Sequence, residues 1–137
     1  LTSRLPLTGI RILAVDDDAD IRELVEFILQ QAGAEVRVFS SATEILQQLE
    51  AFSPEVLIFD IGMPDMDGYM LMRQIRTRLP KMVPAIALTA YAGEIDQQQA
   101  IAAGFQMHLS KPVEPEKLIR AIVTLYNDHL SLPQVNT

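Results

Sequence analysis

The sequence contains no cysteine and no tryptophan, and its charges are mostly negative. The absence of cysteine excludes disulfides, thiol catalysis and thiolate metal sites. Only 11 lysines and arginines oppose 18 aspartates and glutamates, which gives a formal net charge of −7. Nucleic-acid binding needs a basic face, so we expect none by this domain. No apolar run approaches the ~20 residues of a membrane-spanning helix, and we expect no membrane contact.

The length of 137 residues and the hydrophobic content of 49% are typical of one globular domain with a buried core. No signal-peptide pattern opens the chain, so a cytoplasmic setting is expected. We predict a linker over residues 1–8, a folded domain over residues 9–127 and a flexible tail over residues 128–137.

Short apolar runs alternate with segments of helical period along the whole chain. The predicted strands are Ile10–Val15, Glu35–Phe39, Val56–Phe59, Pro84–Leu88 and Phe105–Leu109. The predicted helices are a segment from about Ile21 that Gly33 ends, then residues 42–49, 68–78 and 94–103, and a last helix from about Glu114. Five strands that each precede a helix indicate an α/β fold with a parallel, doubly wound sheet.

Local signals support these boundaries. Ser41 and Glu44 form a capping-box pattern, while Asp18 and Asp67 are expected to cap helices. Gly104 is placed to end the helix over residues 94–103. The middle of that helix is polar, so we expect it to pack thinly.

Functional residues of a doubly wound sheet lie at the carboxyl ends of its strands. Asp16 and Asp17 follow the first predicted strand, and Asp60 follows the third. Each pair of carboxylates ~4 Å apart repels by roughly 4 kcal/mol at an effective dielectric of about 20. Lys111, just past the fifth strand, supplies one compensating charge, and an oxygen-ligated Mg²⁺ would supply two more. Thr89, at the end of the fourth strand, adds a hydroxyl.

Five motifs together resemble one family, the receiver domains of two-component response regulators. They are Val15-Asp16-Asp17-Asp18, Phe59-Asp60, Met63-Pro64-Asp65-Met66-Asp67-Gly68, Leu88-Thr89-Ala90 and Ser110-Lys111-Pro112, in this order. The resemblance covers about Gly9 to Tyr126. It implies a flavodoxin-like five-stranded sheet in the order 2-1-3-4-5 with five helices.

The resemblance also implies a role for each residue of the acidic pocket. Asp60 is similar to the phosphoacceptor nucleophile. Asp17, Asp60 and the backbone carbonyl of Gly62 would bind Mg²⁺ directly, and Asp16 would bind it through water. Such a domain catalyses only its own phosphorylation and dephosphorylation.

Two residues are implied in transmitting the phosphorylated state. Thr89 and Lys111 would each contact a phosphoryl oxygen, and Thr89 is part of the switch. His108 stands three residues before Lys111, where many receivers carry the tyrosine or phenylalanine of the switch. A histidine in a strand is also compatible with a structural role, so both interpretations of His108 stay open.

The partner implied by the resemblance is a histidine kinase or a phosphotransfer domain. The surface of residues 94–103, the strand over Phe105–Leu109 and the last helix would carry the response, and it is the candidate for homodimer formation. The sequences around Leu7-Thr8-Gly9 and 104–113 are similar to receivers of hybrid histidine kinases. A stand-alone regulator and the receiver of a larger regulator are the other contexts.

Three other functions are compatible with parts of this pattern. A haloacid-dehalogenase-type phosphatase shares the aspartate nucleophile and Mg²⁺, but it needs a second aspartate at the position of Gly62. A flavodoxin-like electron carrier binds phosphate after its first strand, where this chain has three aspartates that would repel it. An inert interaction module would not require the acidic cluster.

Overall fold

The computed structural model describes residues 4–64, 66–79, 81–90 and 93–131. Within these ranges, no helix is long and apolar enough to cross a membrane. Asp65, which belongs to one of the five motifs, lies outside the described part of the chain. So do residues 132–137 of the predicted tail.

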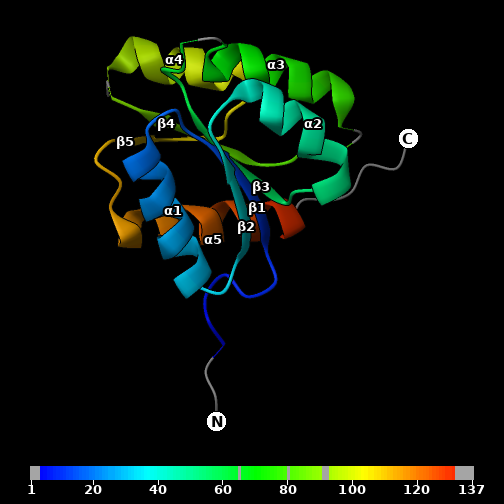
Figure 1. The fold of residues 1–137 in the computed structure, drawn as a ribbon, viewed down its shortest axis with the longest axis vertical. Helices are drawn as coiled ribbons and strands as arrows, with labels where there is room; N and C mark the ends of the chain where they lie inside the picture. Colours follow the sequence, from blue (N-terminus) through cyan, green and yellow to red (C-terminus); the bar gives the residue numbers. More distant parts are fainter. Residues whose placement is uncertain (1–3, 65, 80, 91–92, 132–137) are drawn as a thin grey trace.

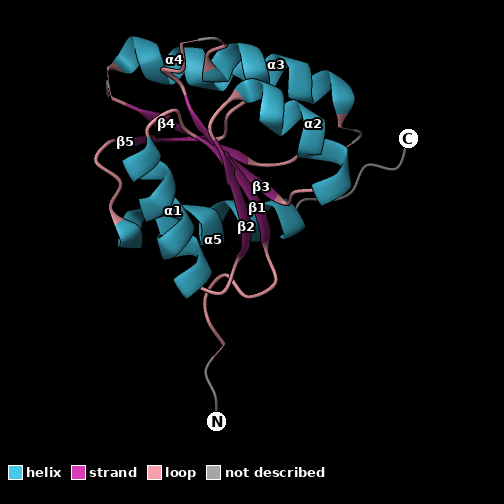
Figure 2. Ribbon diagram, in the orientation of Figure 1, coloured by secondary structure: helices cyan, strands magenta, loops and turns pink. Residues whose placement is uncertain are grey.

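A parallel sheet of five strands forms the middle layer of the domain (Figures 1 and 2). The strands lie in the order β2-β1-β3-β4-β5, which confirms the predicted fold class and strand order. Their bounds are β1 Arg11–Val15, β2 Glu35–Phe39, β3 Val56–Asp60, β4 Ala85–Thr89 and β5 Met107–Ser110. Every residue of β3 and β4 is buried, as expected for central parallel strands covered on both faces.

Helices cover both faces of the sheet, as Figure 2 shows. Their bounds are α1 Ala19–Gln31, α2 Ala42–Phe52, α3 Gly68–Arg78, α4 Glu94–Ala103 and α5 Pro115–Ser131. One core cluster joins α2, α3 and α4 to one face of the sheet, and a second cluster joins α1 and α5 to the other. The strand ends between these two layers are therefore where side chains from several strands can meet.

The predicted helix caps are confirmed. The side chains of Asp18, Ser41 and Asp67 accept hydrogen bonds from backbone N–H groups in the first turns of α1, α2 and α3. Gly104 ends α4 with a φ of 107°, a left-handed conformation that glycine adopts without steric cost.

The amino-terminal segment corrects the prediction of a linker over residues 1–8. Leu7 is completely buried in the α1–α5 core cluster, and its backbone N–H donates to the carbonyl of Ala32. The folded unit therefore begins before Gly9. A single apolar residue outside any periodic run gave no sign of this burial, because the space it fills lies under the α1–β2 connection.

The carboxyl-terminal helix is also longer than predicted. Residues 128–131, which we assigned to the tail, continue α5 through Ser131. His129 therefore lies in the last turn of a helix. Once a long helix is docked by Leu118, Ile122 and Leu125, its further turns need no apolar pattern of their own to continue.

Candidate functional site

The predicted site residues meet at the carboxyl edge of the sheet because the strands are parallel. Asp16 follows β1, Asp60 ends β3 and Thr89 ends β4, while Lys111 follows β5. Asp16, Asp60 and Thr89 are the buried polar residues within the described part of the chain, with exposed fractions of 3%, 4% and 6%. Buried polar groups at this one edge mark it as the candidate functional site.

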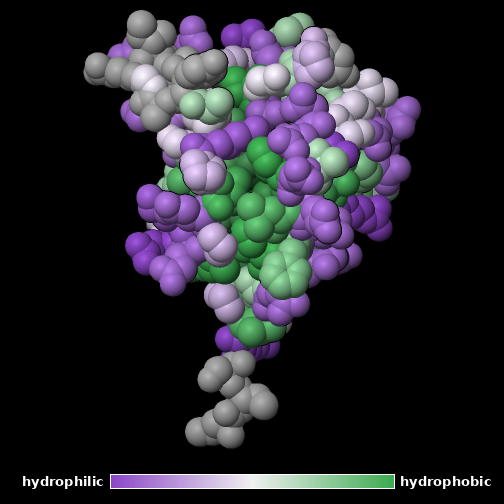
Figure 3. Space-filling model, turned by 60° about the vertical axis from the view of Figure 1, so that its left-hand side comes forward, coloured by the Kyte–Doolittle hydropathy of each residue, from purple (hydrophilic) through white to green (hydrophobic). Residues whose placement is uncertain are grey.

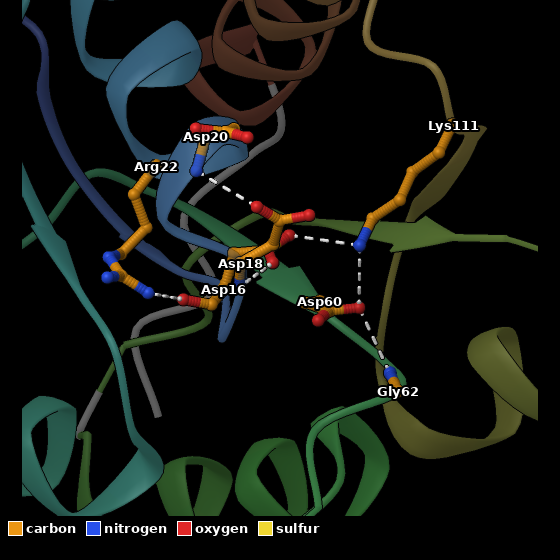
Figure 4. A network of polar contacts seen from close by, with 7 residues as sticks. All are labelled: Asp16, Asp18, Asp20, Arg22, Asp60, Gly62 and Lys111. Atoms are coloured by element: carbon orange, nitrogen blue, oxygen red, sulfur yellow. Dashed lines mark hydrogen bonds and ion pairs between the residues drawn. The ribbon is translucent and has the colours of Figure 1, made fainter.

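Lys111 connects the carboxylates of two strands (Figure 4). Its Nζ lies 3.1 Å from Oδ2 of Asp16 and 3.2 Å from Oδ1 of Asp60. Burial by itself would lower the pKa of Lys111, but hydrogen bonding and Coulomb attraction from Asp16 and Asp60 outweigh it and raise that pKa. The lysine is therefore held in its charged form between the two acids.

The carboxylate of Asp60 is oriented from two sides. The backbone N–H of Gly62 donates to its Oδ1 over 3.0 Å, and Lys111 approaches the same oxygen. A β-carbon built at Gly62 would lie 3.8 Å from Oδ1, so a larger side chain at this position would reach over the carboxylate. Glycine leaves the approach to Asp60 open.

Asp16 is the most enclosed acid of the site. Its Oδ1 accepts a hydrogen bond from the Asp18 N–H, and its carbonyl accepts one from the Arg22 guanidinium. Its Oδ2 is buried, and the Lys111 ammonium, 3.1 Å away, is the group that neutralises it among the described residues. Desolvation by burial, with repulsion from Asp60, raises the pKa of Asp16. A buried, ionised carboxylate is costly unless a cation lies close to it.

Asp17 completes an acidic cluster with Asp16 and Asp60. One carboxylate oxygen of each residue lies within 4.8 Å of the others. Asp17 is exposed, and a side-chain hydrogen bond with Asp60 raises its pKa, with further increases from burial and from the charge of Asp60. Three carboxylates and the Lys111 ammonium carry a formal charge of −2, which one divalent cation would neutralise.

Thr89 and His108 lie on the two strands that border α4. Thr89 pairs in register with Ser110, and its carbonyl accepts the backbone N–H of Lys111 over 2.8 Å. His108 pairs in register with Ala87, and its Nε2 is buried without a hydrogen-bond partner among the described residues. A cavity of about 370 Å³ runs from His108 past Lys111 to Lys117. His108 and Lys111 thus line the same cavity.

Arg22 belongs to the site, and the sequence gave no reason to include it. Its NH1 donates to the carbonyl of Asp16 over 2.8 Å and so holds the loop that carries the acids (Figure 4). An arginine in the first turns of an amphipathic helix is usually a solvated residue. Only the return of α1 over the end of β1 brings it to Asp16.

Comparisons with known proteins agree with this geometry. The family model of the response regulator receiver domain matches residues 12–123. A 14.6 kDa protein from the sodA1 3′ region of Leptolyngbya boryana is 48% identical over 118 residues, which cover 85% of this chain and 89% of that protein. The transcriptional regulatory protein GltR of Pseudomonas aeruginosa is 40% identical over 119 residues. The match covers 85% of this chain and 49% of GltR, so the chain spans about half of that relative.

Solved structures show the same fold. A CheY-like receiver domain protein of Methanospirillum hungatei has a TM-score of 0.81 at 31% identity, with 88% of this chain and 96% of that chain covered. The chemotaxis protein CheY4 of Vibrio cholerae has a TM-score of 0.81 at 32% identity, with 85% and 98% covered. The chain is a member of the response regulator receiver domain family of two-component systems.

Proposed function

We propose that this domain accepts a phosphoryl group on Asp60 from the phosphohistidine of a histidine kinase or phosphotransfer domain. The observation that supports this most directly is the environment of Asp60. It is a buried carboxylate at the end of a central strand, held by Gly62 and Lys111 beside two further acids. Family membership points to the same role.

The reaction exchanges one bond to phosphorus for another. A carboxylate oxygen of Asp60 forms the new P–O bond, and the P–N bond of the donor breaks, so that the imidazole nitrogen takes its electron pair. Phosphoryl transfer depends mainly on positioning and on neutralising charge at the phosphoryl oxygens. The Lys111 ammonium, 3.2 Å from Asp60 Oδ1, would pair with one oxygen, and the Thr89 hydroxyl would bind another.

The residues present fit a bound Mg²⁺. The three clustered carboxylates exceed the single Lys111 ammonium by two negative charges, and this excess favours a hard divalent cation with oxygen ligands. Asp17, Asp60 and the carbonyl of Gly62 would hold it directly, and Asp16 would hold it through water. When bound, the ion supplies positive charge to the phosphoryl oxygens.

The competing phosphatase function lacks its acid. A haloacid-dehalogenase-type enzyme would need a protonated side chain two residues after the nucleophile, and Gly62 has none. The domain would therefore keep its phosphoryl group until its own dephosphorylation, without turnover of external phosphoesters.

The response would pass to the surface of α4, β5 and α5. Thr89 and His108 lie on the paired strands β4 and β5, so movement of Thr89 toward a phosphoryl oxygen would change the surroundings of β5. That surface is the candidate contact for an output partner or a second copy. A cytoplasmic location, where kinase domains act, is part of the proposal.

The decisive experiment follows phosphoryl transfer by intact-protein mass spectrometry. Acetyl phosphate or a phosphorylated kinase, with Mg²⁺, should add one acid-stable, base-labile phosphoryl group, and Asp60→Asn should abolish it. Asp18→Asn is the matched control, because Asp18 is exposed, caps α1 and can be replaced by another good cap residue. Labelling of Asp60→Asn at the wild-type rate would reject Asp60 as the acceptor.

The metal assignment has its own test. Millimolar Mg²⁺ should raise the melting temperature, since a ligand selective for the native state stabilises it. Asp17→Ala should weaken Mg²⁺ binding more than Asp16→Ala, because Asp17 is assigned direct contact. Equal loss in both variants would contradict the assigned ligand set.

Transmission of the signal can be followed by NMR. A beryllofluoride mimic on Asp60 should change amide exchange across residues 89–111 and shift the ring signals of His108. Changes confined to the loop after Asp60 would leave the phosphorylation chemistry in place and reject this route.

A further inference from the structure

A second candidate site lies at the opposite edge of the sheet from the acidic pocket. An open cleft of about 500 Å³ runs between the carboxyl-terminal ends of α3 and α4 and the segment that leads into β4. It is lined by Arg73, Arg76, Leu79, Lys81, Met82, Ala102, Ala103 and Gly104. None of these residues takes part in the acidic pocket.

The cleft concentrates positive charge in an acidic protein. Three of its lining residues are basic and none is acidic, whereas the chain as a whole has a net charge of −7. Neither Arg73 nor Lys81 forms an ion pair with a carboxylate of the described part of the chain, and both side chains are exposed. By contrast, the nearby Arg78 is paired with Glu50 at 2.9 Å.

The guanidinium of Arg76 is held in a fixed position in the cleft by two hydrogen bonds. Its NH1 donates to the carbonyl of Val83 over 2.7 Å, and its NH2 donates to the carbonyl of Gly104 over 2.6 Å. Its Nε is buried without an acceptor among the described residues, and burial lowers its pKa. Gly104 allows this approach, because a β-carbon there would lie 3.2 Å from Nε. The neutral carbonyls orient the guanidinium but do not compensate its charge.

The cleft also offers an apolar contact. Met82 is 60% exposed and lines the cleft, so its side chain is accessible to an occupant. Leu79 is partly buried against the α2–α4 core and lines the same cleft. An occupant would therefore combine negative charge with an apolar group.

We propose that this cleft, defined by Arg73, Arg76, Leu79, Lys81, Met82 and Gly104, docks an acidic segment of a partner polypeptide. A carboxylate of the segment would lie between Arg73 and Lys81, and a neighbouring apolar side chain would cover Met82. The open shape favours a peptide over a small molecule, because small-molecule sites usually enclose most of their ligand.

The test uses the full chain without Mg²⁺ or a phosphoryl donor, so it does not depend on the chemistry of Asp60. A short capped peptide of glutamate and leucine is titrated while backbone amides are followed by NMR. Shifts should gather at residues 73–83 and 102–104, and affinity should fall as ionic strength rises. The same peptide with glutamine in place of glutamate should bind much more weakly.

Three variants locate the binding. Arg73→Gln and Lys81→Gln should each weaken it by about two- to five-fold, as expected for exposed ion pairs. Both residues are exposed, so neither change should disturb folding. Arg120→Gln, an exposed arginine on α5, is the charge-matched control and should leave the affinity unchanged.

Other outcomes overturn the proposal. Equal binding of the glutamine peptide would exclude charge recognition, and shifts centred on α5 would place the contact elsewhere. If acetate or inorganic phosphate alone reproduced the shifts at the same concentration, the cleft would be a small-anion site instead. Failure of Asp60→Asn to block phosphorylation would leave each of these results unaffected.

Discussion

Helices α3 and α4 lie side by side over one face of the sheet (Figure 1), yet they are held to it very differently. α3 buries Leu71, Met72 and Ile75 completely. Among its described side chains, α4 buries only Ala100 and Ala103, and its Ile101 is 69% exposed. Burial of a large apolar side chain contributes about 1.5–3 kcal/mol, so α3 is anchored far more strongly than α4.

The amino-terminal ends of the two helices differ in the same direction. Asp67 caps α3 and accepts a hydrogen bond from the Met70 N–H over 2.9 Å. Gly93 stands at the corresponding position of α4 and provides no side-chain cap. The weakly held helix is the one next to Thr89 and His108, which suits an element that responds to changes in the site.

Exposed apolar side chains do not follow this division between strongly and weakly packed helices. Figure 3 shows a hydrophobic patch in the middle of one face, bordered by hydrophilic side chains. Exposed apolar residues on α1 are Leu24, at 40%, and Phe27, at 62%. The well-packed α1 and the weakly packed α4, whose Ile101 is 69% exposed, therefore both carry exposed apolar groups.

The largest effect is expected when one apolar side chain on each of α3 and α4 is shortened to alanine. Leu71→Ala should cost about 2–5 kcal/mol of unfolding free energy, because it removes a completely buried side chain and leaves a cavity. Ile101→Ala should change stability by no more than about 0.5 kcal/mol, as is usual at exposed positions. Urea denaturation measures both, and a cost for Ile101→Ala near that of Leu71→Ala would contradict the difference in anchoring.

Amide hydrogen exchange tests the comparison without mutation. The opening free energy for amides in residues 97–103 should be at least about 1–2 kcal/mol lower than in residues 71–78, given the value of each large buried side chain. Native-state exchange followed by NMR would show it. Equal protection of the two helices would mean that α4 opens only with the whole domain.

Removal of the α3 cap should have a smaller effect. Asp67→Ala should destabilise the domain by about 1 kcal/mol, because the Met70 N–H loses its acceptor. Asp67→Asn is the control, since asparagine caps nearly as well. Urea denaturation of both variants would separate loss of the cap from loss of charge.

The smallest effect is expected from giving α4 the cap that it lacks. Gly93 has a φ of −69° and a ψ of 154°, which serine adopts readily. Gly93→Ser should stabilise the domain by a few tenths of a kcal/mol and slow exchange at the start of the described α4 amides. A loss of stability instead would show that the backbone at this position needs glycine.

Much of the fold was predictable because its signals are local. The bounds of α3 and α4 agree with the prediction, and the strand over Glu35–Phe39 does too. Local signals mark one end of each helix, because Asp67 caps the start of α3 and Gly104 ends α4. β5 begins at Met107, two residues later than predicted, because Phe105 belongs to the core cluster under α4 before the strand starts.

The site was predictable to a similar degree. Asp16, Asp17, Asp60, Thr89 and Lys111 were selected because parallel strands end at one edge, and the structure brings them to that edge. Arg22 could not be selected this way, since its contact with Asp16 depends on where α1 returns over the sheet.

The sequence by itself determined the parallel α/β fold, the acids at the ends of two strands and the weak packing of α4. Each of these follows from the apolar periodicity of a segment and from the alternation of strands and helices along the chain. Only the tertiary structure decided which oxygens Lys111 contacts and that Leu7 is buried in the core. It also decided that Arg76 is held by the carbonyls of Val83 and Gly104, with no carboxylate partner among the described residues. These features join residues from distant segments of the chain. Their energies depend on the distance between the groups and on their burial, and both are set only when the helices pack on the sheet.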